Sequence, residues 1–274
     1  MSVLLYHHHT SVCAAKSRLA LEEKGVAWDG HFVDLRASDQ YRPDYLAMNP
    51  FGLVPVLVHD GKVIPESTVI NEYVDEVFDG PALRPADPYK RAQMRMWTRM
   101  NDENVHAATG VITSSIAFRH QAKHDDQVGR ILDPYKKDRK TQSVAGGLDN
   151  PHFRTALHRI DILFGQIEEA LGGGGPGQAL AGGGPEWLVG DYSLADVGFA
   201  SYITRFDHLK LDFLWDRRPR VAAWYERLKA RPAYRRAIID WLHHDYSYVE
   251  LMQREGAKQQ NRLRDMIAEI RAAA

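Results

Sequence analysis

The chain has 274 residues, and its 35 Lys and Arg are almost balanced by 36 Asp and Glu, for a formal net charge of −1 at pH 7. This balance gives no charge excess that would draw the protein to nucleic acid or to a membrane, so a small-molecule partner is expected. No stretch approaches the roughly 18 apolar residues of a membrane span, and residues 1–12 lack the pattern of a signal peptide. We therefore expect a soluble, cytoplasmic protein, and its single cysteine excludes an internal disulfide.

The first 80 residues predict a small α/β domain, because strand and helix patterns alternate along them. Asp60-Gly61 is a common hairpin dipeptide, so the strands on either side of it should be antiparallel. The order β-α-β-α-β-β-α is that of a thioredoxin-like domain. Its elements are expected as a strand at 3–6, a helix at 13–24, a strand at 27–35, a short helix at 39–48, two strands within 53–65 and a helix at 67–78.

A proline-rich linker at 79–87 leads into a region of different composition, and residues 88–274 predict an all-α domain with a C-terminal helical extension. The fold class is thus α/β plus all-α, with domain 1–80 followed by domain 88–274. Two stretches, 120–150 and the glycine-rich 171–187, are expected to be surface loops. The predicted helices are 89–118, 153–171, 194–209, 221–230, 233–242 and the charged tail 250–274.

Two short motifs have the composition of a binding site for a peptide-like ligand. Val54-Pro55 precedes a strand, and a cis bond there would leave the Val54 backbone free to pair with an extended ligand. An ordinary trans proline is the alternative, since only about 5–6% of X-Pro bonds are cis. Glu66-Ser67 begins a helix, where Ser67 is the expected N-cap and the first amides can hold a carboxylate. A cap with no ligand is the alternative.

Three segments together resemble the cytosolic glutathione S-transferases: LLYHHHTSVCAAKSRLALEEKGV, NPFGLVPVLVHDGKVIPESTVINEYVDEVF and YSLADVGFASYITRF. The resemblance spans both domains. It implies that glutathione is the co-substrate, that Pro55 is cis, that the Val54 backbone pairs with the cysteinyl unit, and that Glu66 and Ser67 hold the γ-glutamyl end. It also implies a homodimer. Leu53 is expected among the glutathione-binding residues.

Ser193 and Asp196 have the spacing of a capping box. They resemble the folding motif of the same family, and we assign them no catalytic role.

Ser11 and Cys13 are the candidate catalytic residues. Glutathione attacks as a thiolate, and a hydroxyl at the N-terminus of the first helix can donate to its sulfur while the helix dipole favours the charge. Ser11 sits where serine-type transferases place that hydroxyl. Cys13 lies within the first turn of the helix, where a thiol of its own would also be acidified. Both mechanisms stay open from the sequence.

Different segments of the chain resemble family members that catalyse different reactions. The string around Cys13 is similar to zeta-class maleylacetoacetate isomerases and to tetrachlorohydroquinone reductive dehalogenase, in which a matching cysteine forms a mixed disulfide with glutathione. Residues 50–118 look most like bacterial glutathione-dependent β-etherases, which place other residues at the position of Cys13. We expect a glutathione transferase that conjugates or cleaves a hydrophobic, aromatic electrophile of the aryl-ether or aryl-halide type. The alternatives are an isomerase or reductive dehalogenase that uses Cys13, and a non-catalytic glutathione-binding protein.

The electrophile's site is expected between Thr10-Ser11 and the first helices of the second domain. One of the three histidines at 7–9, taken as His9, should line it. Neighbours along a strand end point to opposite faces, so the three cannot share one metal ion and no metal site is expected. The helical residues that should lie there are Met100, Asn104, His106, Ala107, Thr109 and Ser114.

Overall fold

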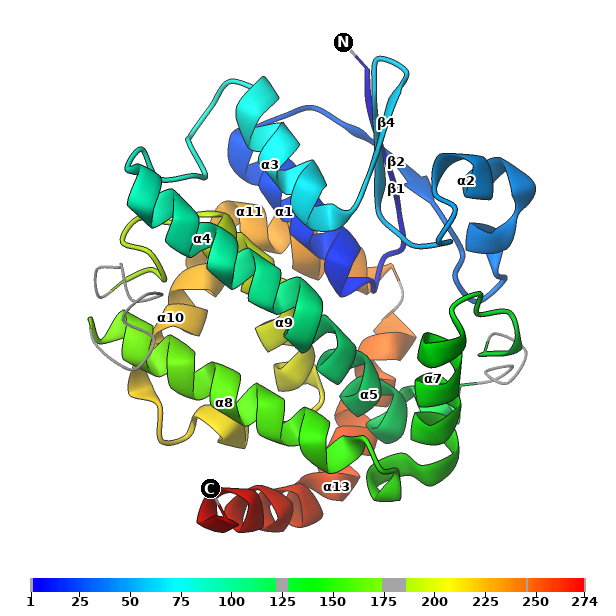
Figure 1. Cartoon of the computed structure of the whole chain (residues 1–274), viewed down its shortest axis with the longest axis vertical. Helices are drawn as coiled ribbons and strands as arrows, with labels where there is room; N and C mark the ends of the chain where they lie inside the picture. The colour runs from blue at the N-terminus through cyan, green and yellow to red at the C-terminus, as the bar shows by residue number, and fades with distance from the viewer. Residues whose placement is uncertain (1, 122–127, 174–185, 245, 274) are drawn as a thin grey trace.

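A mixed four-stranded sheet forms the N-terminal part of the computed structural model, which describes residues 2–121, 128–173, 186–244 and 246–273 (Figure 1). The strand order is β2-β1-β3-β4, with β1 parallel to β2 and the other neighbours antiparallel. The predicted hairpin is confirmed, because β3 and β4 are joined by Asp60-Gly61. The strands are β1 Val3–His7, β2 Asp29–Phe32, β3 Val56–His59 and β4 Lys62–Pro65.

Helices cover the sheet on both faces (Figure 1). Alternate side chains of β1 are buried, as a half-buried strand requires, and Leu5 has no exposed surface. Helix α1 (Val12–Lys24) begins at its N-cap Ser11 and ends at Gly25, whose φ of 68° is the left-handed conformation that glycine adopts without strain. Helices α1 and α3 pack side by side on one face, and α2 lies on the other. The remaining bounds are η1 Asp39–Tyr41, α2 Pro43–Met48 and α3 Ser67–Val77.

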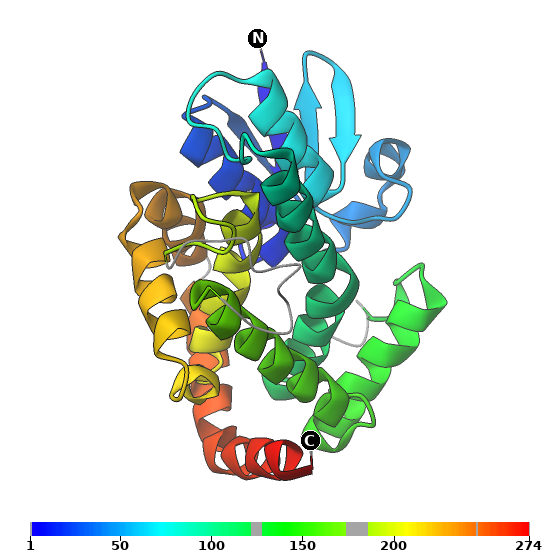
Figure 2. The same cartoon turned by 60° about the vertical axis from the view of Figure 1, so that its left-hand side comes forward.

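The rest of the described chain is helical and lies below the sheet (Figure 2). The fold class predicted from the sequence is therefore confirmed. The helices are α4 Pro88–Met100, η2 Asn101–Val105, α5 His106–Ile116, η3 Phe118–His120, α7 Pro134–Gly146, η4 Gly147–Asp149, α8 Phe153–Leu171, α9 Leu194–His208, η5 Asp212–Trp215, α10 Pro219–Ala230, α11 Pro232–Tyr234, η6 Arg235–Ile239, α12 Asp240–His243 and α13 Tyr246–Ala273. None of the described helices is long and apolar enough to cross a membrane.

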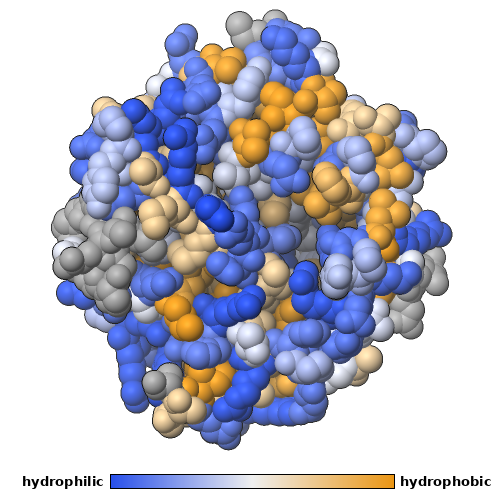
Figure 3. Space-filling model, in the orientation of Figure 1, coloured by the Kyte–Doolittle hydropathy of each residue, from blue (hydrophilic) through white to orange (hydrophobic). Residues whose placement is uncertain are grey.

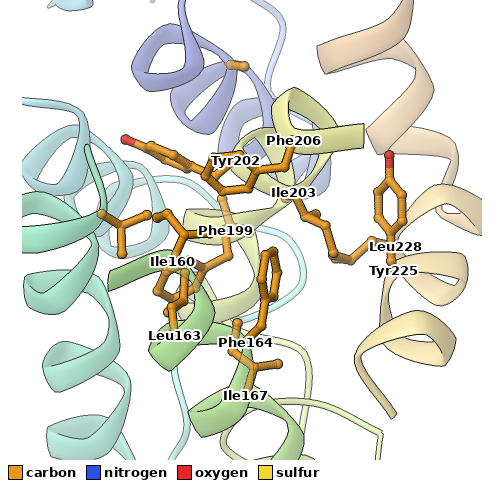
Figure 4. Close-up of a cluster of buried hydrophobic side chains, with 14 of the residues drawn as sticks. Ile160, Leu163, Phe164, Ile167, Phe199, Tyr202, Ile203, Phe206, Tyr225 and Leu228 are labelled. Atoms are coloured by element: carbon orange, nitrogen blue, oxygen red, sulfur yellow. The ribbon is translucent and has the colours of Figure 1, made fainter. Parts of the chain in front are cut away.

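Helix α9 runs through the centre of the helical part, where its side chains interlock with those of α8 and α10 (Figure 4). The capping box predicted at its start is confirmed: the Ser193 hydroxyl accepts from the Ala195 amide, and the Asp196 carboxylate accepts from the Ser193 amide. Asp196 also accepts from the Trp224 indole at 2.9 Å. The hydrogen bonds of Ser193 and Asp196 therefore fix the start of α9. Further along this helix, the Tyr202 hydroxyl points away from the apolar cluster (Figure 4).

Three local predictions are corrected by the structure. The stretch 120–150 is not a loop throughout, because α7 is a regular helix whose N-cap Asp133 accepts from the amides of Tyr135 and Lys136. Ser67 is not an N-cap: Glu66 occupies that position with a φ of 70°, and Ser67 is the first helical residue. The predicted helix 89–118 is interrupted by the π-helical turn η2. Most of the glycine-rich stretch, 174–185, lies outside the described residues.

Candidate active site

Ser11 lies where β1 turns into α1. Its hydroxyl oxygen accepts a hydrogen bond from the Ala14 amide at 3.2 Å, which leaves the hydroxyl proton available for another acceptor. The side chain is half-buried and lines two adjoining cavities. A negatively charged atom at this point would meet both the hydroxyl and the positive end of the α1 dipole.

Cys13 is half-buried in the first turn of α1 and contacts side chains of the helical part. Its Sγ lies 3.4 Å from Nδ1 of His106 and 3.6 Å from the hydroxyl of Tyr202. Burial raises the pKa of the thiol, but the charge and hydrogen bond of His106, the charge of Lys16 and the hydrogen bond of Tyr202 outweigh burial. They lower the pKa from its ordinary 9.0 to about 6. At neutral pH this cysteine is therefore mainly a thiolate.

Lys16 ties the two parts of the chain together beside this cysteine. Its side chain is 1% exposed, and its Nζ donates to the Asp102 carboxylate at 2.9 Å and to the Thr68 hydroxyl at 3.2 Å. The π-helical turn η2 carries Asp102, and His106 is the first residue after it. Single π-helical turns are frequent at functional sites, and this one lies directly at the cavities.

The first cavity, about 310 Å³ in volume, opens between the sheet and the start of the helical part. The structure brings together here all the residues that the sequence assigned to catalysis and to glutathione: Ser11, Cys13, Leu53, Val54, Pro55, Glu66 and Ser67. The Val54-Pro55 bond is cis. Glu66 holds a positive φ that is uncommon for a residue other than glycine, and such conformations cluster at ligand sites.

The second cavity, about 390 Å³ in volume, adjoins the first at Ser11 and His106. Side chains of α5 form one wall, while α7 contributes basic residues. Its size is sufficient for a small aromatic molecule. A thiolate bound at Ser11 in the first cavity would therefore face a molecule bound in the second.

The residues predicted for the electrophile fall into two groups. Thr10, Ala107 and Ser114 line the second cavity, as do His106 and Thr109. Asn104 is exposed, and neither it nor Met100 is among the residues lining the two cavities. His9 does not line them either. It stacks against Phe32 with ring centroids 4.3 Å apart, and His8 lines the second cavity instead.

His7 and His9 both pack against the Trp241 ring, with ring centroids 4.6 Å and 5.5 Å away, while His8 lines the second cavity. His7 is buried, and its Nδ1 is 3.1 Å from the Arg18 guanidinium. Nδ1 of His8 is 3.2 Å from the Thr10 amide. Within the described ranges, no group of three His, Cys, Asp or Glu side chains is placed to hold a metal ion.

Sequence reasoning missed the basic residues that α7 and α9 bring to the cavities. Lys136 and Lys140 line both cavities, and Arg205 lines the second. Burial, followed by the neighbouring charges of Lys136 and Arg205, lowers the pKa of Lys140 to about 8. The i, i+4 spacing of the two lysines was the only signal in the sequence, and it has meaning only once 134–146 is known to be helical.

A thioredoxin-like sheet joined to a helical bundle, with a thiolate site at the start of the first helix, defines a thiol-dependent transferase. Residues 10–77 match the family model described as glutathione S-transferase, N-terminal domain, and residues 155–227 match the corresponding C-terminal domain. The chain belongs to the glutathione S-transferase family and is a glutathione-dependent enzyme.

Relatives within this family carry different activities in their names. The chain is 30% identical over 246 residues to protein LigF of Sphingobium sp. strain SYK-6. This alignment covers 85% of this chain and 91% of LigF. It is 27% identical to the tetrachloro-p-hydroquinone reductive dehalogenase of Sphingobium chlorophenolicum, over 86% of this chain and 96% of that protein. The crystal structure of β-etherase LigF matches with a TM-score of 0.72 at 27% identity, over 88% of this chain and all of that one.

Proposed function

We propose that this transferase binds glutathione in the first cavity and uses its thiolate to displace an ether or halide leaving group from an aromatic substrate in the second. The observation that carries the proposal is the position of Ser11, whose hydroxyl lies at the N-terminus of α1 on the boundary of the two cavities. The similarity to β-etherase LigF supports an aryl ether as one substrate type.

In this proposal each part of the first cavity has one task. The Ser11 hydroxyl donates to the glutathione sulfur and lowers its pKa together with the α1 dipole. The Val54 backbone pairs with the cysteinyl unit, and Ser67 donates to the γ-glutamyl carboxylate while Glu66 accepts from the ammonium group. These contacts fix the sulfur at the mouth of the second cavity, where proximity to the aromatic carbon supplies much of the rate.

A second candidate function rests on the contacts of Cys13 with His106 and Tyr202. The Cys13 thiolate would attack the sulfur of an aryl-glutathione conjugate, forming a mixed disulfide and releasing the aryl group, which takes up one proton. A second glutathione thiolate would then attack the mixed disulfide, giving glutathione disulfide and restoring Cys13. Two glutathione molecules supply the two electrons, and the similarity to the reductive dehalogenase supports this route.

Turnover of two single variants separates the two candidates. With 1-chloro-2,4-dinitrobenzene and a β-aryl ether as substrates, we expect Ser11→Ala to lower kcat strongly while Cys13→Ala has a mild effect. Ser11→Thr is the matched control, because it keeps a hydroxyl at the N-cap. The reverse order, with glutathione disulfide as the product from a halogenated substrate, would favour the cysteine route. Glutathione binding without any product would contradict both.

We also propose a homodimer, as is usual in this family. Several large apolar side chains are exposed on the N-terminal part, including Phe51 at 72% and Val69 at 55%. Apolar surface is visible over the region of β4 and α2 in Figure 3. Size-exclusion chromatography with light scattering should give twice the mass of the chain, and Phe51→Asp should shift the protein toward the monomer. A monomer at micromolar concentration in the unaltered protein would contradict the proposal.

A further inference from the structure

The second cavity is strongly basic. Five cationic side chains line it: Arg36, Lys136, Arg139, Lys140 and Arg205. No described Asp or Glu is among its lining residues. Three of the five, Arg36, Arg139 and Arg205, line this cavity and not the first. Lys136 and Lys140 line both cavities, so the positive charge extends from the glutathione side into the place where the second substrate should bind.

Two of these cations lie against a single aromatic ring. The Lys140 Nζ is 5.8 Å from the ring centroid of Phe118, and the Arg205 Cζ is 5.5 Å from the same centroid. Arg205 is 7% exposed and donates to the backbone carbonyl of Thr10 at 2.5 Å. In the parts of the chain that the structure describes, no carboxylate lies within 4 Å of the charged atoms of Lys136, Lys140 or Arg205.

Like charges that are partly or fully removed from water without counter-charges are costly. Arg205 is buried and Lys140 is half-buried, and desolvation lowers the pKa of both. An anion between them would relieve this cost, and charge-assisted hydrogen bonds to guanidinium and ammonium groups are about twice as strong as neutral ones. Strongly perturbed cations in a cavity are typical of a functional site. The arrangement is therefore suited to an anionic ligand.

The cavity also has apolar wall residues, which lie among polar side chains such as His106, Thr109 and Thr113. Val12, Leu35 and Leu53 approach from the N-terminal part, and Ala107, Val111 and Phe118 from the helical part. Ser11 lines the same cavity, so a planar molecule held against these residues would lie beside the Ser11 hydroxyl. The cavity thus combines an apolar slot with cationic groups.

We propose that the second substrate is an aromatic or conjugated carboxylate, whose anionic group is bound by Lys140 and Arg205 in the second cavity. This inference rests on the proposed function, because it names the substrate class of that same site. It narrows the expected hydrophobic, aromatic electrophile to one that carries a carboxylate. The guanidinium of Arg205 favours a carboxylate, since its planar set of donors can bind both carboxylate oxygens.

A matched pair of substrates tests the inference. 4-Chloro-3,5-dinitrobenzoate and its methyl ester share the leaving group and the ring, and they differ in the negative charge. For each compound, kcat/KM is divided by the rate constant of the uncatalysed reaction with glutathione, so that intrinsic reactivity cancels. We expect the normalised value to be about 10-fold or more higher for the carboxylate, which is the effect of one hydrogen bond to a charged group.

Variants of α7 test whether the preference for the carboxylate substrate depends on the Lys140 side chain. Lys140→Met keeps the length of the apolar stem, and it should lower the carboxylate-to-ester ratio about 10-fold through KM of the carboxylate. Lys140→Arg should restore the ratio, and Lys140→Glu should reverse it. Lys137→Met is the control on the same helix, because Lys137 lines neither cavity and its Nζ donates to the Gly129 carbonyl at 2.7 Å.

The outcomes separate this inference from the proposed function. If neither compound reacts, the proposed function fails. If the ester reacts and the carboxylate shows no normalised advantage, only the inference is overturned. It is also overturned if Lys140→Met raises KM for glutathione and leaves the ratio unchanged, because Lys140 would then bind the carboxylate of glutathione. A lower ratio in Lys137→Met as well would overturn the assignment to Lys140.

Discussion

Replacing His106 by asparagine should raise the pKa of the Cys13 thiol. The Cys13 Sγ is 3.4 Å from the His106 Nδ1, and the charge and hydrogen bond of this imidazole are the largest effects that oppose burial. The fall in pKa from 9.0 to about 6 corresponds to about 4 kcal/mol of stabilisation of the thiolate over the thiol. An opposite charge at this distance shifts a pKa by about 1–3 units, so His106→Asn should raise it by that amount.

The quantity to measure is the midpoint of the pH profile of Cys13 alkylation. The alkylation rate at a single pH does not report the pKa. At pH 7 a thiol of pKa 6 is about 90% ionised and one of pKa 9 about 1%. The intrinsic nucleophilicity of a thiolate falls with its pKa, however, and a Brønsted coefficient of about 0.4–0.5 makes the more acidic thiolate about 15–30-fold slower. The two effects oppose each other and leave a net difference of only about 3–6-fold at pH 7. Only the midpoint reports the pKa directly.

The assay is alkylation with iodoacetamide, followed by mass spectrometry from pH 4 to pH 10. The extent of alkylation is read on the peptide that contains Cys13, which is the single cysteine of the chain. The unaltered protein should show a midpoint near 6, and His106→Asn should show a midpoint about 1–3 units higher. His158→Asn on α8 is the control, because His158 lines neither cavity.

Two results would refute this reasoning. A midpoint between 8 and 9 in the unaltered protein would mean that burial dominates and that Cys13 is an ordinary thiol. A midpoint near 6 that His106→Asn leaves unchanged, in a variant with a normal circular dichroism spectrum, would mean that another group stabilises the thiolate.

Three further predictions concern pH dependence and stability. The pKa of Lys140 is lowered from 10.5 to about 8, so its positive charge is present below pH 8 and is lost above it. The carboxylate-to-ester ratio of normalised kcat/KM should therefore fall between pH 7 and pH 9. A constant ratio would argue against a role of Lys140. Ser193→Ala removes the N-cap of α9 and should lower the free energy of unfolding by about 1 kcal/mol in urea denaturation with an unchanged m-value. In Gly256→Ala the new Cβ would lie 2.0 Å from the carbonyl oxygen of Leu209, so helix α13 must shift. We expect the free energy of unfolding to fall by about 1–3 kcal/mol. An unchanged free energy of unfolding would contradict the close packing of α13 against Leu209.

Most of the fold was predictable because its helices and strands carry clear periodic patterns. Helix α8 has the predicted bounds Phe153–Leu171, and the hairpin at Asp60-Gly61 and the capping box at Ser193 are signalled by local residue types. The domain boundaries at 80 and 88 stay a prediction. In the structure α3 ends at Val77 and α4 begins at Pro88.

Helix α7 could not be predicted from hydrophobic periodicity. Its sequence PYKKDRKTQSVAG is mainly polar, and only Ser143 within it is buried. It is stabilised by the Asp133 N-cap and by packing against α5, and the second of these is a tertiary contact. The π-helical turn η2 was missed for a related reason, because the apolar residues before and after it continue at nearly helical spacing.

The candidate site also has a part that was predictable from the sequence and a part that was not. The residues assigned to glutathione came from short motifs that fold locally or lie in one domain. The contacts of Cys13 join residues 93 and 189 positions apart, so no local pattern could pair it with His106 or Tyr202. The second cavity is basic because α7 and α9 meet there. The composition of the chain, with a net charge near zero, gives no sign of this local excess of positive charge.

A crystal structure with the glutathione conjugate of 4-chloro-3,5-dinitrobenzoate tests the central claim most directly. The account predicts the conjugate sulfur within about 3.5 Å of the Ser11 hydroxyl. It also predicts the γ-glutamyl group at Glu66 and Ser67, with the benzoate carboxylate on Lys140 and Arg205. A conjugate whose glutathione part lies outside the first cavity, or whose sulfur lies away from Ser11, would contradict it.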